Sequence, residues 1–188
     1  MKATAIIELN QLYAAKKFKE LAAHPMIFLK PDWVIELASN ENYGVRYSLA
    51  TNPAIAQFPE VAMNLANDEK WLVRACLAEN PDIAQLPEVA MKLAKDEAPA
   101  ACRWLADNPA VAQLPSVVKQ LCISKDIEVR RSLVGNVNAH QFPEDVLVTL
   151  ANDPKALVAK YLVPHPVLAQ FQNLSPEVDT ISQRSTLE

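Results

Sequence analysis

Arginine and aspartate recur at matched places along this 188-residue chain. Each arginine is followed, one repeat unit later, by an aspartate. The matched residues are Arg46 with Asp68, Arg74 with Asp96, and Arg130 with Asp153. A guanidinium binds a carboxylate or a phosphate in a bidentate manner. Two uses are therefore open: a basic row for phosphate or acidic partners, or ion pairs between neighbouring units.

The units that lack the arginine favour the ion pairs. Phe18 stands at the arginine position before Asn40, and Cys102 stands there before Ser124, so arginine and aspartate are lost together. Paired change indicates spatial contact. We therefore predict that the arginines hold the aspartates of the next unit. Removing one arginine, Arg74, should destabilise the fold by about 1–3 kcal/mol, because its partner is left unpaired.

A second row consists of amides. Its members, one per unit, are Asn52, Asn80, Asn108 and Asn136, and His24 and His165 take the same position in the end units. Asparagine and histidine can both bond a backbone group where a helix stops. The histidines lie too many units apart to share a metal ion, and Cys76, Cys102 and Cys122 have no CxxC spacing. We predict no metal, no cofactor and no catalytic site.

These rows follow from internal repeats of 28 residues. The three clearest units run from Leu37, Leu65 and Leu93. Weaker copies begin at Leu9, Leu121 and Leu150, and a capping helix is expected at about 175–184. Repeats of this length build a continuous core by stacking. The prediction is one all-α domain over residues 1–188, an α-solenoid of about six two-helix units.

Each unit divides into two short helices. Asp68 stands where a helix N-cap belongs, and Asn80-Pro81 stops that helix. A connector with a possible 3₁₀ turn follows. Pro87 then starts the second helix at its first turn, where the missing N–H costs nothing.

The string from Leu65 to Pro81, L-A-x-D-x-x-x-x-V-R-x-x-L-A-x-N-P, resembles the leucine-rich repeat variant (LRV) family. The resemblance covers most of the chain and implies a right-handed superhelix of α- and 3₁₀-helices, related in style to HEAT repeats. Ala101-Cys102 departs from the Val-Arg of the pattern. The resemblance implies a fold and says little about a role.

Positions that vary between units are candidates for binding a partner. One holds Tyr43 and Trp71, which are good anchors if exposed, although packing between adjacent helices is the alternative. A second holds Tyr47, Arg103 and Arg131, with Ala75 and Lys160 at the equivalent places. The arginines are either a short basic strip or ordinary solvated charge.

Composition narrows the function. The net charge of −4 disfavours general nucleic-acid binding, and two glycines leave no phosphate-binding loop. No apolar run is long enough to span a membrane, and the odd number of cysteines suits reduced thiols in the cytoplasm. We predict a non-enzymatic scaffold that binds a protein or peptide. The alternative is a nucleic-acid-binding solenoid of the HEAT-like DNA-glycosylase type.

Overall fold

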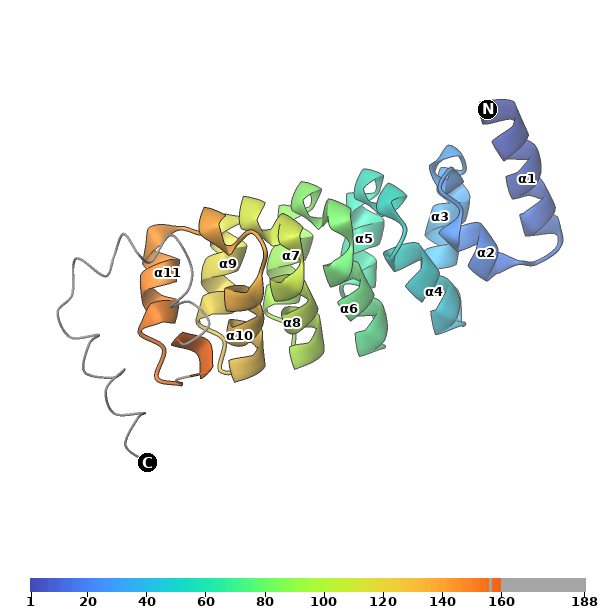
Figure 1. Ribbon diagram of the computed structural model, residues 1–188. Helices are drawn as coiled ribbons and strands as arrows, with labels where there is room; N and C mark the ends of the chain where they lie inside the picture. Colours follow the sequence, from blue (N-terminus) through green and yellow to red (C-terminus); the bar gives the residue numbers. More distant parts are fainter. Residues whose placement is uncertain (156, 160–188) are drawn as a thin grey trace.

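The computed structural model describes residues 1–155 and 157–159, and this part of the chain is helical without strands (Figure 1). The predicted all-α class is confirmed for these residues. Helix α1 (Lys2–Ala14) precedes a series of α–3₁₀–α units. The units comprise α2 (Phe18–Ala23), η1 (Ile27–Leu29) and α3 (Pro31–Ala38); α4 (Tyr43–Ala50), η2 (Pro53–Gln57) and α5 (Pro59–Leu65); α6 (Trp71–Glu79), η3 (Pro81–Gln85) and α7 (Pro87–Ala94); α8 (Pro99–Asp107), η4 (Pro109–Gln113) and α9 (Pro115–Cys122); α10 (Ile127–Gly135), η5 (Ala139–Gln141) and α11 (Glu144–Ala151).

Prolines mark where the connectors and the second helices begin in the three central units. Pro53, Pro81 and Pro109 open 3₁₀ connectors, each preceded by an asparagine whose side chain caps the connector. A second proline opens the following helix, as Pro59 and Pro87 do. Proline suits a first turn because its missing N–H has no intrahelical partner there. The predicted 3₁₀ connectors and proline helix starts are therefore present.

The elements form three parallel rows. The first helices α2, α4, α6, α8 and α10 each pack on the next, and so do the second helices α3, α5, α7, α9 and α11. The connectors η1 to η5 lie side by side along one edge. The first helices contact one another more closely than the second helices do. Figure 1 shows the resulting extended stack, with α1 at one end and α11 toward the other.

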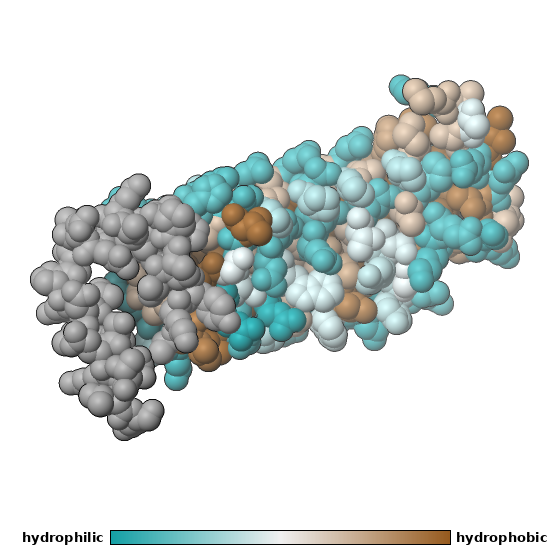
Figure 2. Space-filling model, viewed as in Figure 1, coloured by the Kyte–Doolittle hydropathy of each residue, from teal (hydrophilic) through white to brown (hydrophobic). Residues whose placement is uncertain are grey.

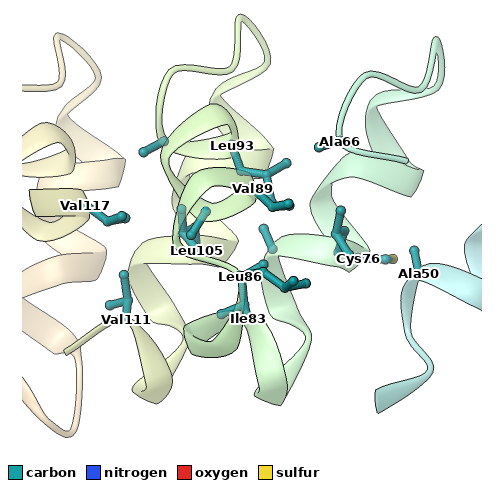
Figure 3. Packing of buried hydrophobic residues seen from close by; sticks show 14 of the residues in the cluster. Ala50, Ala66, Cys76, Ile83, Leu86, Val89, Leu93, Leu105, Val111 and Val117 are labelled. Atoms are coloured by element: carbon teal, nitrogen blue, oxygen red, sulfur yellow. The ribbon is translucent and has the colours of Figure 1, made fainter. Parts of the chain in front are cut away.

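The core runs between the rows without interruption. Val89 and Leu93 of α7 and Leu105 of α8 are buried in one continuous cluster with their counterparts in the other units (Figure 3). Cys76 of α6 points toward Ala50 of α4. Helices of this length are marginal in isolation, so burial between neighbouring units supplies their stability.

An aromatic cluster holds α1 against the first unit. The rings of Tyr13 and Trp33 stack 4.3 Å apart, and Lys30 Nζ lies over Trp33. The Tyr13 hydroxyl donates to Glu36, and this hydrogen bond raises the pKa of Tyr13. Figure 2 shows that apolar surface gathers near this N-terminal end, while the middle of the stack is largely hydrophilic on the visible face. The predicted capping helix at 175–184 lies outside the described residues.

Candidate functional site

The arginine row forms the predicted links between units. Arg74 Nε donates to Asp96 Oδ2 at 2.7 Å, and Nη2 donates to Asp96 Oδ1 at 2.9 Å. Its third nitrogen, Nη1, donates to the backbone carbonyl of Asp68 at 2.6 Å, inside its own unit. Arg46 and Arg130 repeat this arrangement: they pair with Asp68 and Asp153 and donate to the carbonyls of Asn40 and Ser124.

These ion pairs are largely shielded from solvent. The side chains of Arg74 and Asp96 are 9% and 2% exposed. The hydrogen bond to Asp96 raises the pKa of Arg74, and the matching bond from Arg130 lowers the pKa of Asp153. Every arginine of the row is thus already bonded to a carboxylate and a backbone carbonyl of the protein, which argues against a phosphate-binding role. The extra bond to the carbonyl, within the arginine's own unit, was not anticipated.

Cys102 shows what replaces the arginine. Its Sγ lies 3.5 Å from the carbonyl oxygen of Asp96, the counterpart of the carbonyl that Arg74 Nη1 reaches in Asp68. Burial is the main cause that raises the pKa of the Cys102 thiol. In the next unit, the Ser124 hydroxyl accepts from the Asp126 amide. The thiol keeps the bond within its unit, but the ionic link to the next unit is missing at this junction.

The aspartates do not cap the helices in the predicted way. Helix α6 begins at Trp71, with Lys70 at its N-cap, so Asp68 lies two residues before the cap. Asp68 Oδ1 accepts from the Lys70 amide at 2.8 Å and so shapes the turn into the helix. Asp96 and Asp153 make the same bond to Ala98 and Lys155. Each carboxylate therefore accepts from the turn before the helix and from the arginine of the preceding unit, and it does not cap the first turn of the helix.

The asparagine row forms a second set of links. Asn108 Nδ2 donates to the carbonyls of Ala78 and Asn80, each at 2.9 Å, and its Oδ1 accepts from the Ala110 amide. The carbonyls belong to the end of the preceding unit's first helix, so the row joins units as well as capping connectors. Asn52, Asn80 and Asn136 bond in the same way, and all four are buried.

The histidines and cysteines take structural positions. His24 Nδ1 accepts from the Met26 amide, as the asparagine side chains do, while His165 lies outside the described residues. The cysteines are free and buried, and burial raises the pKa of Cys122 to about 11. Within the described ranges, no group of histidine, cysteine and carboxylate side chains is arranged to hold a metal ion.

The first-helix face is the side of α4, α6, α8 and α10 turned away from the core. Tyr43 and Trp71 are 48% and 49% exposed on it, so they do not pack away between helices. Tyr47 is only half-exposed: it packs on the core, and its hydrogen bond with Cys76 raises its pKa. Ala75, at the equivalent position on α6, is fully buried, so this second position is not uniformly outward as expected.

Arg103 and Arg131 are both exposed on the first-helix face. Arg131 Nη1 lies 3.2 Å from Glu128 Oε2 on the same helix, which offsets its charge. Lys160, the third member of the predicted strip, lies outside the described residues. The two described arginines therefore hold equivalent positions on neighbouring helices, and one of them is already paired.

Carboxylates are frequent around the exposed aromatics. Glu79 and Asp107 are exposed at the ends of α6 and α8. Glu41, Glu69 and Glu97 are exposed in the turns before α4, α6 and α8. On the other side of the stack, shallow grooves separate the starts of the second helices, and they too carry carboxylates, Glu60 and Glu88 among their walls.

Comparison of the chain with protein families, with curated proteins and with solved structures finds no match. In the part of the chain that the structure describes, no helix has the length and apolar character needed to cross a bilayer.

Proposed function

We propose that residues 1–188 form one α-solenoid of about six 28-residue two-helix units, similar to the LRV family. We propose further that it is a non-enzymatic scaffold for a protein or peptide partner. Support for the stack comes from the asparagine row, which links neighbouring described units through the same atoms, and from the arginine row, which adds ion pairs at three junctions. The closer packing of the first helices favours a bend toward them, which would place the first-helix face on the concave side.

The exposure of Tyr43 and Trp71 is the observation that carries the interaction role. Large aromatics at corresponding positions of adjacent helices form a paired anchor, and aromatic side chains dominate binding energy at protein interfaces. Neither ring is needed to complete the core, which is continuous beneath them. The polar groups that recur from unit to unit are bonded within the protein, so the varying exposed positions are the ones free to select a partner.

The alternative nucleic-acid role has weaker support. Phosphate binding requires several unpaired cations along one surface. Of the described basic positions on the first-helix face, Arg131 is paired with Glu128 and Lys70 with Glu69. The buried free thiols suit the proposed cytoplasmic location, where cysteines stay reduced.

Peptide selection from a random displayed library tests the interaction role. We expect selected peptides to bind the purified chain and to lose affinity at least fivefold on Tyr43→Ala or Trp71→Ala, in line with the loss of an aromatic anchor. Ile35→Ala is the matched control, because Ile35 is 57% exposed on α3, in the row of second helices. Failure to select any peptide that depends on Tyr43 or Trp71 would refute the proposal.

A further inference from the structure

We propose that the first-helix face between α4 and α8 binds a basic, arginine-containing linear peptide. This inference rests on the proposed function and names the chemistry of the partner. It is carried by the combination of exposed aromatic rings with an excess of carboxylates around them.

Helical geometry places the relevant side chains on one surface. Trp71 and Glu79 are exposed at the two ends of α6, while Ala75, four residues from each, is buried between them. Each has a counterpart on the neighbouring helices, because α4, α6 and α8 lie side by side in the same register. The aromatic position therefore forms a row across the stack, and the Glu79 position forms another row parallel to it.

The two rows that flank the aromatics are acidic. On one side are Glu41, Glu69 and Glu97, in the turns that precede the helices; on the other are Glu79 and Asp107, near the helix ends. Exposed cations in the same turns and on the same helices are Lys70, Lys95 and Arg103, and Glu69 already lies near Arg46 and Lys70. Five carboxylates against three cations leave this surface negative, and electrostatic complementarity then favours a cationic partner.

Tyr47 of α4 is half-exposed and packs on the core, and α4 packs on α6, the helix that carries Trp71 and Glu79. Glu79 ends α6, about 12 Å along the helix axis from Trp71, and is exposed as well. A cationic group seated on the Trp71 ring would thus have a carboxylate within the same surface.

Arginine fits this surface better than other cations. A guanidinium stacks flat on an aromatic face, and its edge still donates to carboxylates in a fixed fork. Arg46 and Arg74 already use this fork with aspartates beneath the surface, but those carboxylates are taken. Glu41, Glu79 and Glu97 make no ion pair with another described residue.

Fluorescence anisotropy with defined peptides tests the proposal. The probe is a labelled twelve-residue peptide with four Arg-Gly-Ser triplets, and the comparison peptides carry glutamine or glutamate in place of arginine. We expect the arginine peptide to bind at least tenfold more tightly than either. Raising NaCl from about 50 to 300 mM should weaken it about tenfold, because exposed charges are screened.

Substitutions in the chain localise the binding. Trp71→Ala should weaken the arginine peptide about three- to tenfold, as the loss of a cation–π contact implies. Glu79→Gln and Glu97→Gln should also weaken it, whereas Glu144→Gln, which removes an exposed carboxylate on α11, should leave Kd within twofold. Equal affinity of the glutamine peptide, or unchanged affinity in Trp71→Ala, would overturn the proposal.

Failure here is separable from failure of the proposed function. Selected library peptides that require Trp71 but carry no basic residues would overturn the basic-peptide inference and leave the scaffold intact. The absence of any peptide dependent on Tyr43 or Trp71 would remove both.

Discussion

Replacement of Arg74 by alanine is the sharpest test of how the units are joined. The change removes two bonds to the Asp96 carboxylate and one to the Asp68 carbonyl. Asp96 is left with a side chain only 2% exposed and a single remaining donor, the Ala98 amide. Breaking a buried ion pair from one side costs about 3–5 kcal/mol. We expect a loss of about 3 kcal/mol, at the low end because the Ala98 bond survives.

Urea unfolding followed by circular dichroism at neutral pH measures this loss. Asp96→Ala and the double variant complete a mutant cycle, in which we expect a coupling energy of at least about 1 kcal/mol. Arg103→Ala is the control: it removes an exposed arginine one position away from the row and should change stability by less than about 0.5 kcal/mol. A loss below about 0.5 kcal/mol for Arg74→Ala, or single effects that simply add, would refute the ion-pair reasoning.

Three further predictions concern other bonds that link the units. Cys102→Arg should destabilise the fold, because a guanidinium there has no carboxylate to pair with. Adding Ser124→Asp should recover at least about 1 kcal/mol of the lost stability in a melting experiment. A double variant whose loss of stability equals the sum of the two single losses would contradict this prediction. Asn108→Ala should cost about 2–3 kcal/mol, because the buried Ala78 carbonyl loses its amide donor and the Asn80 carbonyl keeps only the Ile83 amide. Asn108→Asp should cost more at pH 7, since a carboxylate would face those carbonyls; the reverse order in urea titrations would be contradictory. Pairing with Arg130 lowers the pKa of Asp153, so this pair stabilises the fold fully above the ordinary aspartate pKa, and the stabilisation is lost as pH falls through the lowered pKa. Asp153→Asn should therefore flatten the acid limb of a plot of unfolding free energy against pH. An unchanged acid limb would contradict this prediction.

The ion pairs were predictable because both partners carry sequence information. Arginine and aspartate disappear together at Cys102 and Ser124, so the sequence itself indicates the contact. The bond to the Asp68 carbonyl was not predictable in this way, because a backbone group is the same in every residue. The asparagine row has the same limit: its amides were expected to bond a helix end, but nothing in the sequence says that the end belongs to the preceding unit.

Helix starts and exposure were harder to predict than contacts. Asp68 has the residue type of an N-cap, yet its carboxylate is engaged by Arg46 and the Lys70 amide, and the helix begins only at Trp71. Variation between units indicated an outward position for Ala75, but the residue is fully buried. A small side chain such as that of Ala75 can be covered by larger side chains of the neighbouring helices. The repeat pattern gives the position of a residue in its unit but not the size of the side chains that pack next to it.

The direction of the links has a consequence for how such a chain can lengthen. The arginine of each unit reaches forward to the following unit, and the asparagine reaches back to the preceding one. A duplicate of residues 65–92 inserted after Lys92 would therefore meet an aspartate ahead of it and helix-end carbonyls behind it, and the interrupted bonds would re-form with the copy. Gene duplication can extend the array by whole 28-residue steps, whereas insertion of half a unit would leave a buried arginine or asparagine without its complement.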